Sequence, residues 1–240
     1  MILSVYSTCK TTILIGTIES FTKTLDNPLN ENSGGHLIVS EEILDYYEID
    51  GLYHFTHVAH LPSVFNYGLR SHNNAHELDL VQHDISNPDV QDLRAQRFIG
   101  GRPLHDYVPL YFNPRNAMLF DVFKKHTLKD IVVLRLSRKL MLQKGVWFTD
   151  GNAANFPTLS YDSLDDLNKL DWECIRAEYW NEYEDGKRKC MAEILIPDKI
   201  SANYIKRKSH IFVENQETRD RVEAILPNVR VAISEDLYFT

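Results

Sequence analysis

Glu193 is the side chain whose surroundings most directly suggest chemistry. It stands among five apolar residues in the run MAEILI, residues 191–196. A carboxylate in such a run is either on the solvent face of an edge strand or buried for a purpose, because burying an unpaired charge is costly. Strand alternation puts Glu193 on the same face as Met191 and Leu195, which favours a carboxylate that faces a pocket.

Two arginines upstream of Glu193 are candidates for binding an anionic substrate. Pro88 can open a short helix over residues 88–97, on which Arg94 and Arg97 lie one turn apart on the same side. The two guanidinium groups could clamp an anion, and the Gly-Gly-Arg-Pro loop that follows is compatible with that role. A solvated helix face is the alternative.

The run LHDYVPLYFNPRNAMLF, residues 104–120, is the densest apolar and aromatic stretch of the chain. Its segment 107–111 predicts a strand buried on both faces, since apolar and polar residues do not alternate there. Pro109 cannot donate a hydrogen bond to a neighbouring strand, so we expect a sheet edge, a bulge or a strand end. The stretch is either a pocket wall or a core strand.

Four residues are predicted to line one pocket: His54, Arg94, Tyr111 and Glu193. The sequence has no P-loop, no GxGxxG motif, no Ser-His or Cys-His nucleophile arrangement and no spacing typical of metal ligands. An arginine and a glutamate suit cleavage at an anomeric carbon. There a carboxylate stabilises an oxocarbenium-like transition state and an arginine holds a phosphate.

The elements that position these residues are predicted from hydrophobic spacing. The predicted strands cover residues 52–57, 107–111, 130–137, 146–150, 191–196, 205–213, 229–234 and 237–239. The predicted helices cover residues 88–97, 161–172 and 214–226, with one that starts at Leu61 and ends near Gly68, and a short acidic one capped by Ser40. Residues 29–35 and 71–90 are predicted loops. This mixture indicates an α+β fold.

Composition places the chain among soluble globular proteins, with 240 residues, 43% hydrophobic and 25% charged. No apolar run approaches the roughly 18 residues of a membrane span, and Cys9, Cys174 and Cys190 lack the spacing of a zinc site or a disulfide framework. We therefore expect a cytoplasmic, reduced, metal-free protein. Residues 1–50 hold two basic and eight acidic side chains, so they contribute −6 of the net charge of −8. Basic runs such as 187–189 are usually solvated faces.

Several short motifs, in the same order over most of the chain, resemble the DarT family of bacterial toxins, ADP-ribosyltransferases that modify bases in single-stranded DNA using NAD. The matching blocks are YHFTH at 53–57, LPS at 61–63 with Gly68-Leu69, VQDLR at 90–94, LHDYVPLYF at 104–112 with Pro114-Arg115 and Met118-Leu119, FTDG at 148–151, LDW at 170–172, and Ala192-Glu193. Seven ordered blocks are far more specific than any one of them.

The resemblance implies an ADP-ribosyltransferase-like fold, with central mixed or antiparallel sheets flanked by short helices around an NAD cleft. It implies that Glu193 is the catalytic glutamate that orients the nicotinamide ribose, and that Arg94 is the catalytic arginine, which also contacts NAD. The other cofactor contacts that it implies are His54, Phe55, Thr56, Ser63 and Ser71. Residues 147–189 would supply the loop that presents DNA.

The same resemblance implies the biological setting. The expected protein is the toxin of a toxin-antitoxin system, which transfers ADP-ribose from NAD to a base in single-stranded DNA, thymine being the expected base. Its expected partner is a DarG-like macrodomain antitoxin that removes the modification. Residues 51–240 would form the transferase domain. Residues 1–50 would be an acidic N-terminal extension, which we interpret as a cover or a partner-binding arm.

Some positions depart from the family pattern. The chain has Pro109-Leu-Tyr-Phe where family members usually have PFYF, Arg115-Asn-Ala-Met where they have RSPM, and Leu93 beside Arg94 where a second arginine is common. These departures affect the acceptor more than the NAD chemistry. The alternatives are an NAD glycohydrolase, a transferase that acts on guanine, RNA or protein, and an inactive nucleic-acid binding module. The presence of both Arg94 and Glu193 argues against the last.

Overall fold

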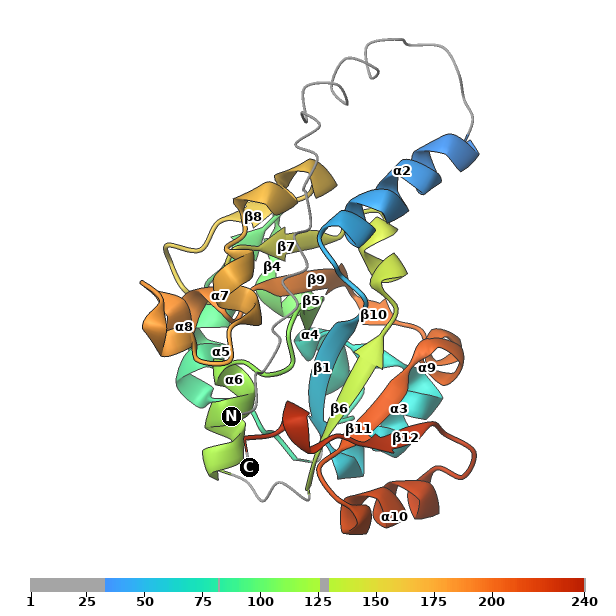
Figure 1. The fold of residues 1–240 in the computed structure, drawn as a ribbon. Helices are drawn as coiled ribbons and strands as arrows, with labels where there is room; N and C mark the ends of the chain where they lie inside the picture. The colour runs from blue at the N-terminus through green and yellow to red at the C-terminus, as the bar shows by residue number, and fades with distance from the viewer. Residues whose placement is uncertain (1–32, 82, 126–129, 240) are drawn as a thin grey trace, which may run out of the picture. The chain divides into compact units, whose positions relative to one another are not determined.

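The computed structural model of the protein describes residues 33–81, 83–125 and 130–239. By its internal contacts the chain divides into Met1–Ile38 and Val39–Thr240, and the second unit contains the sheets (Figure 1). Of the predicted loop 29–35, residues 29–32 lie outside the described residues, as does Cys9, whose reduced state stays a prediction. Residues 33–35 belong to a helix, so the loop prediction is wrong for them. Of the helices described, none combines the length and the apolar character that crossing a membrane requires.

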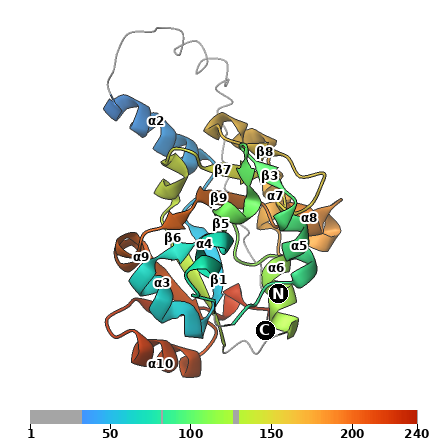
Figure 2. The same ribbon diagram turned by 180° about the vertical axis from the view of Figure 1, so that it is seen from behind.

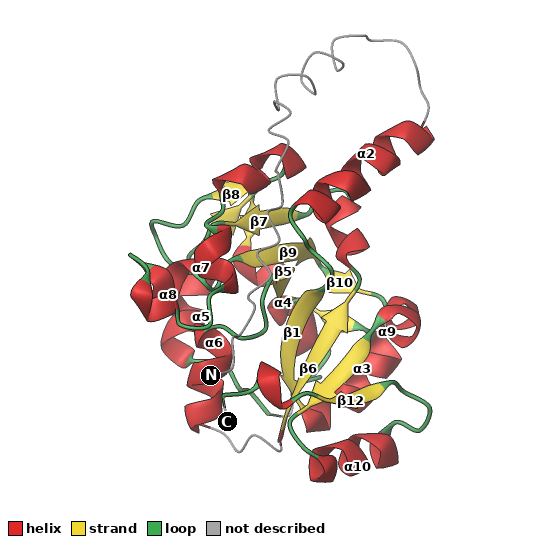
Figure 3. Cartoon of the chain, viewed as in Figure 1, coloured by secondary structure: helices red, strands yellow, loops and turns green. Residues whose placement is uncertain are grey.

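Twelve short strands build the described sheets (Figure 3). They are β1 (Leu52–His57), β2 (Leu69–Arg70), β3 (Phe98–Ile99), β4 (Arg102–Pro103), β5 (Tyr107–Tyr111), β6 (Ile131–Leu136), β7 (Trp147–Thr149), β8 (Ser160–Tyr161), β9 (Glu193–Pro197), β10 (Lys199–Ile200), β11 (His210–Val213) and β12 (Val231–Ile233). Eight form one sheet in the order β12-β11-β6-β1-β5-β9-β7-β8, and β10-β2 and β3-β4 form two small sheets. Among the described strands of the large sheet, β11 and β12 run parallel and the other neighbours run antiparallel.

Short helices flank this sheet. They are α2 (Ser33–Tyr46), α3 (Leu61–Tyr67), α4 (His72–Glu77), α5 (Pro88–Ala95), α6 (Ala117–Lys125), α7 (Trp172–Arg176), α8 (Gly186–Lys189), α9 (Ala202–Lys208) and α10 (Gln216–Ile225). Viewed from behind, α3 and α4 lie in front of the strands (Figure 2). The predicted α+β class, with mixed and mainly antiparallel sheets between short helices, is confirmed.

The core lies along β1 and β6, which are joined by six register pairs from Leu52↔Leu136 to His57↔Ile131. Residues 131–134 of β6 are fully buried, as their continuous apolar run predicts. Leu44 of α2 and Ile49 also belong to this core, with 0% and 4% of their surface exposed. The boundary drawn at residue 50 stays a prediction.

Pro109 lies at an opening inside the sheet. Its strand β5 is central in strand order, and Pro109 is paired with Leu195 of β9. On the other side, β5 meets β1 at one register pair, Tyr53↔Tyr111. Of the three expected positions, a sheet edge, a bulge or a strand end, the outer edge is therefore excluded. A proline is tolerated here because β5 pairs with β1 only at Tyr111. On that side of β5, residue 109 therefore has no strand partner that requires a backbone N–H donor.

The predicted helix over residues 161–172 is wrong, because two shorter elements replace it. A 3₁₀ helix, η5, covers Leu164–Lys169, and α7 follows. Leu164, Leu167 and Leu170 repeat every three residues, which is the period of a 3₁₀ helix rather than of an α-helix. The Asp171 carboxylate then accepts a hydrogen bond from the Cys174 amide at 3.1 Å and starts α7 afresh.

One predicted loop and one predicted strand each contain a helix in the structure. In the predicted loop 71–90, α4 forms behind Ser71, whose hydroxyl accepts from the Asn74 amide at 3.5 Å. In the predicted strand 205–213, α9 precedes β11, and Ser201 caps α9 by accepting from the Tyr204 amide at 3.3 Å. The apolar pattern missed both because each helix is fixed by a side-chain cap rather than by an apolar stripe.

Both ends of the described chain differ from prediction as well. Helix α2 begins at Ser33, so Ser40 lies inside the helix and not at its start. At the other end, residues 235–237 form a 3₁₀ helix, which replaces the start of the predicted closing strand 237–239. The Tyr238 side chain is 1% exposed and donates from its hydroxyl to the Phe212 carbonyl at 3.0 Å. Tyr238 therefore packs in the core instead of belonging to a closing strand.

Candidate active site

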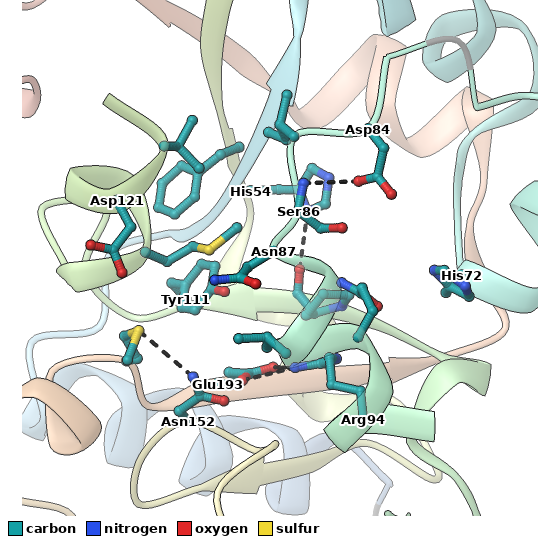
Figure 4. A pocket seen from close by; sticks show the side chains of 18 of the residues that line it. His54, His72, Asp84, Ser86, Asn87, Arg94, Tyr111, Asp121, Asn152 and Glu193 are labelled. Atoms are coloured by element: carbon teal, nitrogen blue, oxygen red, sulfur yellow. Dashed lines mark hydrogen bonds and ion pairs between the residues drawn. The ribbon is translucent and has the colours of Figure 1, made fainter. Parts of the chain in front are cut away.

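A cavity of about 540 Å³ opens beside the junction of β1, β5 and β9 (Figure 4). All four residues predicted to share a pocket line it: His54, Arg94, Tyr111 and Glu193. Phe55 and Thr56 line it too. Its volume falls in the range of small-molecule and cofactor sites. The prediction that the stretch around 107–111 is a pocket wall is confirmed.

Arg94 and Glu193 form a buried ion pair in the wall of this cavity. The Arg94 Nη1 group donates to both Glu193 carboxylate oxygens, at 3.1 Å to Oε1 and 3.0 Å to Oε2. Arg94 is 7% exposed and Glu193 1% exposed. Figure 4 shows the two side chains pointing toward each other from α5 and β9. The apolar run around Glu193 therefore holds a paired, pocket-lining carboxylate and not a solvated one.

The protein backbone also binds Glu193. The Ala153 amide donates to Glu193 Oε1 at 2.8 Å. The Thr149 hydroxyl accepts from the Glu193 amide at 3.1 Å and donates to the Gly151 carbonyl at 2.7 Å. A carboxylate held by a guanidinium and an amide is fixed in one orientation, which suits a group that must face a reacting atom.

His54 bridges the opening between β1 and β5. Its Nδ1 lies 3.0 Å from the Pro109 carbonyl oxygen, which can only accept, so Nδ1 carries a proton. Burial lowers the pKa of His54, although the Pro109 bond opposes this effect. A neutral His54 with a protonated Nδ1 leaves Nε2 as a hydrogen-bond acceptor.

Two stacked aromatic rings form another part of the wall. Phe55 and Tyr111 have ring centroids 5.0 Å apart and planes 12° apart. Tyr111 is also the register partner of Glu193 across β5 and β9. Burial, and then the nearby Glu193 carboxylate, raise the pKa of Tyr111 far above its ordinary value. Its hydroxyl therefore stays protonated and cannot act as a base near neutral pH.

The family model for DarT, described as an ssDNA thymidine ADP-ribosyltransferase, matches residues 53–239. The chain belongs to the DarT family. A DNA ADP-ribosyl transferase–DNA ADP-ribosyl glycohydrolase fusion protein of Thermosipho africanus is 28% identical over 78% of this chain and 48% of the fusion. The DarT-family chain thus spans about half the length of that relative.

Solved DarT structures share this fold. Thermus sp. 2.9 DarT in complex with ADP-ribosylated ssDNA is 28% identical, with a TM-score of 0.71 over 80% of this chain and 97% of that one. Thermus sp. 2.9 DarT in complex with NAD+ is 27% identical, with a TM-score of 0.65 over 80% of this chain and 98% of that one. The ADP-ribosyltransferase-like fold expected for the DarT family is confirmed.

Two residues expected to contact NAD do not line the cavity of this DarT-family chain. Ser63 donates from its hydroxyl to the His60 carbonyl at 2.8 Å. Ser71 is 0% exposed, and its hydroxyl caps α4. Their role in binding NAD stays a prediction.

Arg97 does not join Arg94 in an anion clamp. Its Nη1 and Nη2 groups donate to the Phe156 and Thr158 carbonyls at 3.3 and 3.1 Å. Arg97 is therefore committed to the loop after β7, and the expected clamp is not formed.

Sequence reasoning missed a cluster of histidines on the cavity wall, His72, His76 and His105. The ring of His72 lies 4.3 Å from that of His76 and 4.1 Å from that of His105, between centroids. Burial and the two neighbouring imidazoles lower the pKa of His72 to about 4. Two of the three sit on α4, in the segment predicted as a loop. No group of three or more metal-binding side chains is arranged as a metal site in the described part of the chain.

Proposed function

We propose that this protein transfers ADP-ribose from NAD to a base in single-stranded DNA, with thymine as the acceptor, and releases nicotinamide. The observation that carries the proposal is the Arg94–Glu193 pair, buried yet open to a cavity of cofactor size. Its support is membership of the DarT family and likeness to Thermus sp. 2.9 DarT in complex with NAD+ and with ADP-ribosylated ssDNA.

In the proposed reaction, the bond between C1′ of the nicotinamide ribose and the nicotinamide nitrogen breaks. Nicotinamide leaves as a neutral molecule, so no strong general acid is needed. A nitrogen of the acceptor base bonds to C1′ and loses its proton to water. The work left to the protein is alignment and stabilisation of the positive charge at C1′.

The residues of the cavity fit these tasks. The Glu193 carboxylate, fixed by Arg94 and the Ala153 amide, would orient the nicotinamide ribose and stabilise the developing cation. The Arg94 guanidinium would also contact the NAD phosphates. His54, Phe55 and Thr56 would bind NAD from β1. Because an acceptor base must be unstacked to reach C1′, single-stranded DNA is the expected acceptor.

We infer that the protein acts as the toxin of a toxin-antitoxin system in the cytoplasm. The Thermosipho africanus relative is a fusion of a DNA ADP-ribosyl transferase with a DNA ADP-ribosyl glycohydrolase, which supports a partner that reverses the reaction. The proposed partner is a DarG-like macrodomain hydrolase. Treating modified DNA with such a hydrolase should restore the original mass of the oligonucleotide, and resistant adducts would contradict this partner.

Mass spectrometry of mixed-sequence single-stranded oligonucleotides, incubated with the protein and NAD, tests the proposed function. A gain of one ADP-ribose is expected with the wild type and with Glu223→Ala, an exposed glutamate of α10 as the matched control. Glu193→Ala should give none. Free nicotinamide without tagged DNA would instead support the NAD glycohydrolase, and a tag on another base would correct the acceptor. A tagged product with Glu193→Ala would overturn the site.

A further inference from the structure

The loop over residues 151–158, which follows β7, carries a contact that the proposed site depends on. It contains Ala153, whose amide donates to the Glu193 carboxylate at 2.8 Å. Asn152 and Asn155 of the same loop line the cavity, and Figure 4 shows Asn152 beside Glu193. The loop has no strand or helix of its own. Contacts with other parts of the protein must therefore fix the position of the loop relative to Glu193.

Contacts inside the loop give it a folded shape. The Asn152 side-chain oxygen accepts from the Ala154 amide at 2.9 Å, and the Thr158 hydroxyl donates to the Asn152 carbonyl at 2.7 Å. These bonds define a turn but do not attach it to the rest of the protein. The position of Ala153 relative to Glu193 must be set from outside the loop.

Two arginines attach the loop from outside: Arg97 donates to the Phe156 and Thr158 carbonyls, and Arg188 of α8 holds the end nearest Glu193. Its Nη1 group donates to Asp150 Oδ1 at 2.9 Å and lies 3.2 Å from the Thr158 hydroxyl oxygen, so it contacts both ends of the loop. Its carbonyl accepts from the Asn152 amide at 2.9 Å. Its Nε also donates to the Asp185 carboxylate, which holds the guanidinium itself in position.

The fit between Arg188 and the loop is close enough to require a glycine. A Cβ added at Gly151 would lie 2.4 Å from Arg188 Nη1 and 2.9 Å from the Arg188 carbonyl oxygen. Such distances are below van der Waals contact, so the guanidinium packs directly on the Gly151 backbone. This contact gives a physical reason for the order Phe148-Thr-Asp-Gly151. Thr149 binds the Glu193 amide, Asp150 binds Arg188, and Gly151 packs against Arg188.

Burial separates Arg188 from its basic neighbours. Arg188 is 8% exposed, whereas the Lys187 side chain is 66% exposed. The interpretation of residues 187–189 as a solvated basic face is therefore wrong for Arg188. Burying a guanidinium removes it from water, and the free energy lost is recovered only when its carboxylate partners are well placed. The good placement of Asp150 and Asp185 around Arg188 therefore points to a specific role for this arginine.

We propose that Arg188 is a positioning residue for the transfer reaction: through Asp150 and Thr158 it fixes the loop 151–158 so that the Ala153 amide holds the Glu193 carboxylate. The inference rests on the proposed function for its effect on the reaction. Its effect on the loop can be measured without any reaction.

Hydrogen exchange of the full-length protein tests the effect on the loop. In Arg188→Gln, amides of residues 150–154 should exchange faster by on the order of ten-fold or more, because the loop loses its attachment to α8 and keeps only the one that Arg97 makes at Phe156 and Thr158. Arg219→Gln, an exposed arginine of α10 paired with Glu223, is the matched control and should not change them. Should Arg188→Gln fold poorly, Asp150→Asn/Arg188→Gln removes the partner charge as well and should show the same local exchange. Unchanged exchange in the folded variant overturns the inference.

Kinetics test the effect on the reaction. In Arg188→Gln, kcat with NAD and an oligonucleotide should fall on the order of ten- to a hundred-fold, as expected for one charge-assisted hydrogen bond lost to Glu193, with little change in the KM for NAD. Arg188→Lys should recover part of kcat, since an ammonium can still reach Asp150. A higher KM with unchanged kcat would overturn the positioning role. If the wild type tags no DNA, the proposed function fails, and hydrogen exchange alone decides the position of the loop.

Discussion

Arg94 and Glu193 are 99 positions apart in the chain, yet one guanidinium nitrogen lies within 3.1 Å of both carboxylate oxygens. Each partner neutralises a charge that would otherwise be buried alone. Removing one partner of such a pair costs about 3–5 kcal/mol, whereas replacing both with neutral side chains is often neutral. The pair therefore has separable consequences for stability and for activity.

We expect Arg94→Met and Glu193→Gln each to lower the free energy of unfolding by about 3–5 kcal/mol, because each strands a buried charge. The double variant should recover most of this loss, since the glutamine introduced by Glu193→Gln could still accept from the Ala153 amide. None of the three should tag DNA. Urea denaturation and the oligonucleotide assay measure both effects. Additive destabilisation in the double variant would show that the two charges do not interact.

Phe156 should contribute to binding of single-stranded DNA. Its side chain is 90% exposed, and it follows Asn155, which lines the cavity. Stacking of a base on an aromatic ring contributes about 1–3 kcal/mol. We therefore expect Phe156→Ala to weaken oligonucleotide binding about 5- to 150-fold, without changing stability or NAD turnover in the absence of DNA. Tyr67→Ala, 54% exposed on α3, is the control. Equal affinities in the two variants would exclude Phe156 from the DNA surface.

The protein should lose stability as the pH falls below about 6.5, in part through His54. Burial lowers the pKa of folded His54 below the ordinary value of 6.5. Between these two pKa values the unfolded chain binds more protons, so the free energy of unfolding decreases as the pH decreases. Above 6.5 both states are neutral and the contribution is constant. The slope for one such histidine is at most about 1.4 kcal/mol per pH unit.

His54→Gln isolates this contribution. A glutamine amide can still donate to the Pro109 carbonyl but does not titrate. Denaturation at about pH 7.5 and about pH 5.5 should show a smaller acid-induced loss in the variant than in the wild type. Other partly buried histidines with a lowered pKa, such as His72, keep the remainder of the loss. Identical losses in the two proteins would contradict a neutral His54 with a lowered pKa.

Gly151→Ala should impair both stability and transfer. The new methyl group would overlap Arg188, and overpacking of this kind costs about 1–3 kcal/mol. Gly101→Ala is a useful comparison, because no atom lies within 4 Å of its Cβ and its φ of +80° alone is strained. That substitution should cost about 1–2 kcal/mol and leave kcat unchanged. Calorimetry and transfer kinetics on both variants distinguish loop displacement from general strain.

The strands that carry the site, and most of the residues that line it, could be predicted from the sequence. The strands at 52–57, 107–111 and 191–196 follow from apolar spacing, and a lone Glu193 in an apolar run predicts a pocket because an unpaired charge cannot be buried cheaply. Seven ordered motifs added the resemblance to the DarT family. The spacing of three between Leu164, Leu167 and Leu170 indicates a 3₁₀ helix, although leucines at such short intervals are also compatible with an amphipathic α-helix.

Only the tertiary structure shows which side chains the site residues contact. It pairs Arg94 with Glu193 and Arg97 with the loop after β7, although the two arginines are one turn apart. It places Pro109 at an opening inside the sheet and buries Arg188 against two aspartates. Local spacing fixes which side of a helix or strand a residue occupies. The residue that it contacts on that side belongs to a distant segment of the chain, and the position of that segment depends on the packing of the whole core.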